Sequence, residues 1–245
     1  YGYSDKVAYL HSEDIPPQIV KQIADRVALV KEMLVYGVLR GCTNTYFGGT
    51  GTTIATVNGA LSLNFIRRIV RNLQANHGDP MNTMLSASPD YGTDAVEASY
   101  TAYCHTNLSP DIRTVPGFIP TANYGSGKAL PNEIGKIENV RIITSPDLPE
   151  LQDAGAAVAG LGLTSTTGTS ADVYPFIVMA QDFFCQIAVR GLGSLDPTFL
   201  PPGKKDKSDP LGQRGYAGTS WWGQSMIENN GWGALGYVAM NTLTG

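Results

Sequence analysis

The stretch IPPQIVKQIADRVALVKEMLVYGVLR, residues 15–40, decides the fold. Its apolar residues recur at steps of four or three, at Ile15, Ile19, Ile23, Val27, Val30, Leu34 and Val38. This spacing places them on one face of an α-helix. Asp14 can cap the start of the helix, Pro16 and Pro17 suit its first turn, and Gly41 can end it. We therefore predict a helix of about 39 Å, long enough to serve as the spine of a flat or elongated body.

A second amphipathic helix is predicted over residues 61–73. Its apolar residues lie four apart, at Leu61, Phe65, Ile69 and Leu73. Its arginines, Arg67, Arg68 and Arg71, project away from this apolar face. The β-branched and glycine-rich segment 43–59 between the two helices reads as a strand and a turn. Gly78 and Pro80 are expected to stop the second helix.

Most of the remaining chain is predicted to form strands. Residues 96–105 alternate between apolar and polar groups, as in a half-buried strand, and a short helix begins at Ser109 and Pro110. Further extended segments are expected at 134–145, 173–180, 183–189, 212–226 and 237–240, and those at 173–180 and 183–189 are expected to be buried strands. The segment 152–170 is of low complexity and is predicted to be a loop. Because helices and strands do not alternate in a βαβ rhythm, the expected fold class is α+β.

The composition excludes several classes of function. The chain has 245 residues, of which only 16% are charged, and a formal net charge of −4. A broad basic face for gripping nucleic acid is therefore not expected, whereas a small basic patch stays open as an alternative. Three cysteines without paired spacing argue against a disulfide scaffold or a zinc cluster. Apolar runs fall far short of the roughly 20 residues needed to cross a bilayer, so no membrane partner is predicted.

The sequence contains no recognisable catalytic motif, so no catalytic, cofactor-binding or metal site is predicted. The string GGTGTT, residues 48–53, lacks the Lys-Ser/Thr ending of a phosphate-binding loop and is read as a turn. The three histidines have acidic neighbours but no metal-ligand spacing. Cys104 precedes His105 on a predicted strand, where consecutive side chains point to opposite faces, so the two cannot easily form a catalytic pair. A carboxylate pair remains open because its separation is spatial, and a hydrolase using that pair or Cys104 is a third hypothesis.

Aromatic and basic residues gather near the C-terminus. Trp221, Trp222 and Trp232 can form a stacking or subunit contact, or pack in a corner of the core. Lys204, Lys205 and Lys207 lie in a segment flanked by proline and glycine, which is typical of a solvated hairpin tip. In an assembly, this tip could meet a carboxylate of a neighbour.

Several strings, taken in order, resemble the major capsid proteins of tailed bacteriophages, specifically the coliphage-N-four-like branch of the HK97-type fold. They are YGY with Asp5, YCH at 103–105 with SPDIR at 109–113, Tyr124-Gly125, NEIGKI at 132–137 with VRIIT at 140–144, and DPLGQR at 209–214 with Gly218 and Trp222. The resemblance covers nearly the whole chain. It departs from the family at Gly212, where the family has asparagine, and at Thr144, which follows Ile143 without the family's intervening acidic residue.

The resemblance implies a two-lobed subunit. Residues 1–50 and 196–228 would form a peripheral lobe around the spine helix, and residues 51–195 and 229–245 an axial lobe. The family's N-terminal arm and extended hairpin have no counterpart here, and the chain begins at Tyr1, so we expect it to start after them. The candidate subunit contacts are Lys204, Lys205, Lys207, Arg214, Trp221 and Trp222.

The resemblance also implies a function without chemistry. Copies would form pentamers and hexamers of an icosahedral shell around double-stranded DNA, without sequence-specific contact and without a cofactor. Portal and cement or decoration proteins are the other expected partners. The expected location is the virion capsid, assembled in the cytoplasm of the host bacterium. The alternative is an encapsulin-like compartment, which resembles the same fold but encloses enzyme cargo.

Overall fold

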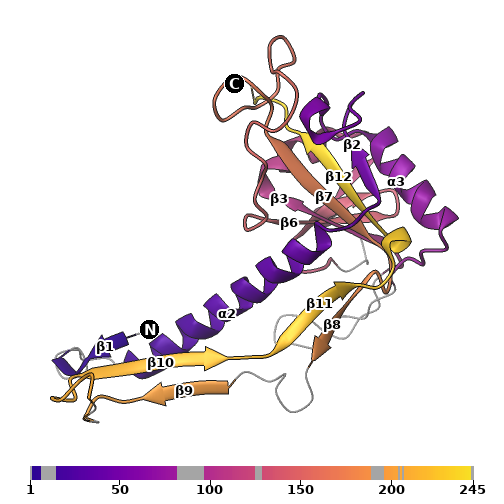
Figure 1. Cartoon of the computed structure of the whole chain (residues 1–245). Coiled ribbons are helices and arrows are strands. Elements are labelled where there is room, and N and C mark those ends of the chain that lie inside the picture. The colour runs from indigo at the N-terminus through magenta and orange to yellow at the C-terminus, as the bar shows by residue number, and fades with distance from the viewer. Residues whose placement is uncertain are drawn as a thin grey trace. The chain divides into compact units, whose positions relative to one another are not determined.

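A computed structural model describes residues 2–6, 15–81, 97–124, 129–188, 196–203, 205 and 207–243 of the chain (Figure 1). Two compact units share these residues. Unit 1 comprises Tyr1–Val35 and Gln186–Met226, and unit 2 comprises Tyr36–Cys185 and Ile227–Gly245. Each unit is assembled from segments far apart in the sequence. The helix α2 (Ile15–Leu39) begins in unit 1 and ends in unit 2.

Unit 1 combines the first part of α2 with a three-stranded antiparallel sheet. The sheet has the order β1 (Gly2–Ser4), β10 (Arg214–Ser220) and β9 (Asp196–Leu200). The ring of Tyr3 on β1 stacks on that of Phe199 on β9, with 6.0 Å between the ring centroids. Two further strands, β8 (Phe184–Ala188) and β11 (Gly223–Ile227), pair with each other, and each has residues in both units.

The helix α2 has 25 residues and confirms the predicted spine helix to within one residue. It ends just before Gly41, as predicted. The amides of Gly41 and Cys42 donate to the carbonyls of Val38 and Leu39, three residues back, so the last turn is tightened. Asp14 lies outside the described residues. The predicted apolar stripe is uneven: Val27 is buried, Ile19, Ile23, Val30 and Val38 are half-buried, and Leu34 is 59% exposed. The described part of the chain therefore leaves Leu34 mostly uncovered, and the side chain of Ile15 is outside that part.

Unit 2 is built on a seven-stranded mixed sheet. Its order is β2 (Thr45–Phe47), β12 (Gly233–Ala239), β7 (Val173–Met179), β3 (Tyr100–His105), β6 (Val140–Ser145), β5 (Glu133–Ile137) and β4 (Phe118–Pro120). The pairs β2–β12 and β3–β6 are parallel, and the other pairs are antiparallel. All residues of β7 and β12 are buried, as expected for central strands covered on both faces.

The helix α3 (Leu63–Ala75) covers one face of this sheet (Figure 1). Ser62 caps its start by accepting a hydrogen bond from the amide of Phe65. Its buried residues, Phe65, Ile66, Ile69 and Leu73, join side chains of β3, β6, β7 and β12 in the main core. The helix ends in a Schellman motif, in which His77 has a φ of 58° and the Gly78 amide donates to the Leu73 carbonyl.

The short elements follow the sequence predictions with two corrections. The strand predicted as half-buried over 96–105 is present as β3, but its polar Thr101 is only 4% exposed, because β3 lies between β7 and β6 in the central sheet. The helix α4 (Ser109–Thr114) begins at Ser109, as predicted. The segment 134–145 forms the hairpin of β5 and β6, and the loop 152–170 holds only isolated bridges. The strand predicted at 183–189 is present as β8, but the expectation that it is buried is wrong. Phe183 is buried, whereas Ile187 is 47% exposed, because β8 pairs only with β11 and lies outside the central sheet.

The division into units differs from the predicted lobe boundaries. The predicted peripheral lobe included residues 36–50, which belong to unit 2 in the structure. The reason is local, because Tyr36 and Leu39 are buried and β2 pairs with β12. No helix in the described ranges is both long and apolar enough to cross a lipid bilayer.

Candidate functional site

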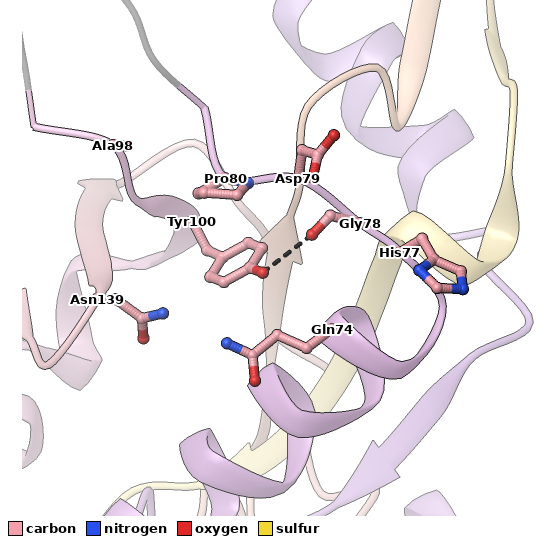
Figure 2. A pocket seen from close by; sticks show the side chains of 8 residues that line it. All are labelled: Gln74, His77, Gly78, Asp79, Pro80, Ala98, Tyr100 and Asn139. Carbon is pink, nitrogen blue, oxygen red and sulfur yellow. Dashed lines mark hydrogen bonds between the residues drawn. The ribbon is translucent and has the colours of Figure 1, made fainter.

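A polar pocket of about 340 Å³ lies where α3 ends and β3 begins (Figure 2). Its lining is Gln74, His77, Gly78, Asp79, Pro80, Ala98, Tyr100 and Asn139. The Tyr100 hydroxyl donates to the Gly78 carbonyl at 2.9 Å, and burial raises the pKa of this hydroxyl. Figure 2 shows the side chains of His77 and Asp79 pointing away from that hydroxyl and away from each other. The lining offers polar contacts but no nucleophile held by a base, so it has no arrangement for covalent catalysis.

The predicted separation of Cys104 and His105 is confirmed. Cys104 is fully buried in the main core, and burial raises the pKa of its thiol far above the usual range. The imidazole of His105 lies beside the ring of Tyr174 and accepts a hydrogen bond from the Asn107 amide at 3.0 Å. A neutral thiol with no base beside it is a poor nucleophile, so Cys104 acts as a core residue.

Residues 48–53 form the predicted turn. Gly49 has a φ of 70°, which favours glycine, and a Cβ at Gly48 would come within 2.5 Å of the Gly59 carbonyl oxygen. The side chain of Asn58 bridges the turn by accepting from the Thr50 amide at 3.0 Å. The glycines therefore permit close backbone packing. Within the described ranges, no three His, Cys, Asp or Glu residues are placed to hold a metal ion; His11 lies outside these ranges.

Unit 1 exposes an unusual amount of apolar surface. Among the described residues, ten of the 13 exposed large hydrophobic side chains belong to it: Val20, Met33, Leu34, Ile187, Phe199, Leu200, Leu211, Tyr216, Trp222 and Met226. Val27 and Ala217 are the buried hydrophobic residues in the described part of this unit. An apolar groove of about 200 Å³ runs between α2 and β10, lined in part by Ile23, Val27 and Trp221. In its described part, unit 1 thus exposes many large apolar side chains and buries few hydrophobic ones.

The candidate contact residues fall into two groups. Lys205, Lys207 and Arg214 are exposed, and Lys204 lies outside the described residues. Trp222 is 63% exposed, whereas Trp221 is half-buried beneath the ammonium group of Lys31, 5.4 Å from the ring centroid. Trp232, the third tryptophan, packs against the core of unit 2 and donates from Nε1 to the Asn76 carbonyl. The structure therefore separates Trp232 from the two tryptophans of unit 1.

Two aspartates in the strings that resemble the capsid family make hydrogen bonds that the sequence did not indicate. Asp111, in the string SPDIR, is buried and accepts two hydrogen bonds from Asn241, from its amide at 2.9 Å and from its side chain at 3.0 Å. Asp209, in the string DPLGQR, accepts from the amide of Arg214 at 2.7 Å and shapes the entry into β10. Aspartate next to proline signals a turn or a cap. The sequence does not show which donor each carboxylate meets, and only the structure identifies Asn241 for Asp111 and Arg214 for Asp209.

A buried ion pair joins Glu133 and Arg141, from the strings NEIGKI and VRIIT. Their side chains are 0% and 2% exposed, and the Nη1–Oε2 distance is 3.1 Å. Glu133 also accepts from the hydroxyl of Tyr124 and, at 2.7 Å, from the amide of Leu130. This network ties β5, β6 and the segment before them into one body.

The chain is similar in sequence and in fold to known phage capsid proteins. No family model matches the chain. The major capsid protein of Pseudomonas phage KPP21 is 23% identical over 224 residues, which cover 84% of this chain and 56% of that protein. The chain therefore spans little more than half the length of this relative. Among solved structures, the capsid of Ralstonia phage GP4 matches with a TM-score of 0.66 at 13% identity, over 100% of this chain and 72% of that one.

The chain has the fold of the HK97-type capsid proteins. This confirms the predicted fold and its α+β class. The same fold is present in the SrpI encapsulin of Synechococcus elongatus, which matches with a TM-score of 0.53 at 14% identity, over 100% of this chain and 74% of the encapsulin. The HK97-type fold thus occurs both in phage shells and in a protein compartment.

Proposed function

We propose that this chain is the shell-forming part of a phage major capsid protein. Copies of it assemble into pentamers and hexamers of an icosahedral shell that encloses double-stranded DNA. The apolar surface of unit 1 carries this proposal: side chains such as Leu34 and Trp222 lie exposed on a unit whose described part buries few hydrophobic residues. A monomer rarely leaves so many large apolar groups in water, whereas contacts between copies would bury them. The relative from phage KPP21, a major capsid protein, supports the same function.

The roles of the two units, the branch of the family and the partners are part of this proposal. Unit 1 serves as the peripheral lobe with α2 as its spine, and unit 2 serves as the axial lobe. The ordered strings support the coliphage-N-four-like branch. Portal and decoration proteins would bind the assembled shell, which forms in the cytoplasm of the host bacterium and ends in the virion. The chain needs no catalytic group or cofactor for this role, because burial between copies is the function.

Electron microscopy of particles that contain this protein tests the proposal. The expected result is an icosahedral shell with capsomers of five and six copies. A protein found only as a monomer outside particles would refute it.

A pair of variants connects the test to unit 1. Trp222→Ser removes a large exposed apolar group from unit 1, and it should lower shell yield strongly while the subunit still folds. Leu161→Ser is the matched control, because Leu161 is also exposed, at 44%, but lies in unit 2. Equal yields from the two variants would show that the apolar surface of unit 1 is not an assembly contact.

An encapsulin-like compartment is the second candidate, favoured by the match to the SrpI encapsulin. The two candidates differ in what the particle holds. Extraction of particle contents with phenol, followed by gel electrophoresis and mass spectrometry, separates them. Long double-stranded DNA supports the phage shell, and an enzyme in fixed proportion to the shell protein supports the compartment.

A further inference from the structure

The solvent-facing side of α3 is basic along its length. At 100° per residue, Asn64, Arg67, Arg68, Arg71 and Asn72 fall within about 140° of one another, opposite the buried apolar face. The helix sequence, LNFIRRIVRNLQA, contains no acidic residue. These five residues and Tyr46 line a hollow of about 610 Å³. We call this hollow the arginine face; it lies wholly within unit 2.

The guanidinium of Arg68 is held in place before any ligand arrives. It lies over the rings of Tyr46 and Phe65, at 5.2 and 5.8 Å from their centroids, and Nη2 donates to the Phe47 carbonyl at 3.3 Å. Stacking on aromatic faces leaves the other edge of the planar fork free to donate. Because the side chain of Arg68 is already ordered, binding an anion there costs less side-chain conformational entropy.

The neighbours of Arg68 set the charge of the arginine face. Arg67 is paired with Glu138, which follows β5, and both side chains are largely exposed. Arg71 is exposed. The side-chain oxygen of Asn72 accepts from Asn44 at 2.9 Å, which leaves its amide NH₂ as a donor for a ligand. With one carboxylate against three guanidinium groups, the local charge is positive on a chain whose net charge is −4.

We propose that the arginine face binds the phosphate backbone of double-stranded DNA. From residue 64 to residue 72 the donors span about 12 Å along the helix, a row that can meet several phosphates, since each strand carries one charge per about 3.4 Å. Guanidinium groups fit phosphate oxygens in pairs, and asparagine side chains are common phosphate donors. A row of donors in an open hollow suits a polymer of charge without base-specific contact. This inference rests on the proposed function, which supplies the enclosed DNA.

The salt dependence of DNA binding tests this assignment. The unassembled full chain is titrated against a fluorescent 24-base-pair duplex by anisotropy at 50 to 200 mM NaCl. Arg68→Gln/Arg71→Gln should flatten the slope of log K against log [salt] by about 1.8, at about 0.9 per lost phosphate contact. From 50 to 200 mM NaCl, the fold-loss of affinity should therefore be about 12 times smaller for the variant than for the wild type. Arg26→Gln/Arg113→Gln, at exposed arginines of α2 and α4, is the charge-matched control and should leave the slope unchanged.

Two single variants sharpen the test. Arg71→Gln touches no packed group, and it should flatten the slope by about 0.9 without affecting the fold. Glu138→Gln frees Arg67 from its partner, so it should steepen the slope by a similar amount. A gain of salt dependence on removal of a single carboxylate cannot arise from misfolding.

The outcomes separate this inference from the proposed function. Equal slopes for the wild type, Arg71→Gln and Glu138→Gln would overturn the inference, even if shells form normally. Loss of shells in Arg71→Gln with an unchanged slope would also overturn it, since the arginine face would then bind an acidic surface of a second copy. If the wild-type protein never forms shells, the proposed function fails, and the slopes still decide whether the arginine face binds phosphate.

Discussion

Replacing Glu133 by glutamine should be among the most damaging isosteric changes in unit 2. The carboxylate is fully buried, contacts Arg141 at 3.1 Å, and accepts from the Tyr124 hydroxyl and the Leu130 amide. Glutamine keeps one acceptor oxygen but turns an NH₂ group toward donors. Arg141 is left as a buried cation without its carboxylate, 2% exposed, with the ring of Tyr124 5.4 Å away.

Breaking a buried ion pair from one side costs about 3–5 kcal/mol. That range corresponds to a roughly 150- to 5,000-fold shift in the unfolding equilibrium, at about 1.4 kcal/mol per factor of ten. Urea unfolding of the unassembled subunit, followed by circular dichroism, measures it. With a slope of about 1–3 kcal/mol per molar urea, the midpoint of the transition should fall by at least about 1 M.

The double variant Glu133→Leu/Arg141→Met is the internal control. It removes both charges together and replaces them with apolar groups, so its loss should be much smaller than that of Glu133→Gln, because no unpaired charge remains buried. Arg67→Gln breaks the exposed pair with Glu138 and should leave the urea midpoint close to that of the wild type, because an exposed ion pair contributes little to stability. A midpoint for Glu133→Gln within about 0.3 M of the wild type would refute the argument that this pair is buried and coupled.

Three further predictions follow from single contacts. Asp111→Asn turns an amide NH₂ toward the donors of Asn241 and should cost about 1–3 kcal/mol in thermal unfolding; an unchanged melting temperature would mean that this clamp does not form. Burial raises the pKa of Tyr36 to about 12, so its neutral phenol contributes stability that is complete below pH 10 and is lost as pH rises through 12. Tyr36→Phe should reduce that alkaline loss, and identical urea midpoints from pH 9 to 12 in both proteins would contradict it. Ile23→Asp places a carboxylate in the apolar groove of unit 1 and should abolish shell assembly, whereas Ala28→Asp, at an exposed position of α2, should not; normal particle yield from Ile23→Asp would argue against α2 as a spine.

The sequence was most informative where its signal is periodic. Helix α2 was predicted to within one residue of its end, and the start of α4 was predicted from Ser109 and Pro110. Periodicity reports which residues share a face, but not what covers that face. Leu34 belongs to the predicted stripe and is 59% exposed, and Ile187 lies on a predicted buried strand and is 47% exposed.

Pairings between distant residues were beyond the sequence. Nothing in the spacing indicates that Asp111 accepts from Asn241, or that Arg68 stacks on Tyr46. Both contacts depend on the order of strands in the central sheet, where β12 lies between β2 and β7. Strand order is set by the burial of whole faces, which short-range patterns do not encode.

The sequence by itself determined the two amphipathic helices, the α+β class, the burial of Cys104 away from His105, and, through its ordered strings, the resemblance to phage capsid proteins. Only the tertiary structure decided which apolar residues stay in water. It collected them on unit 1 and left the arginine side of α3 uncovered. The physical reason is that local periodicity selects helix or strand, whereas exposure depends on every segment that packs against a residue. The surfaces that we propose to join copies and to meet DNA are those that the fold leaves uncovered.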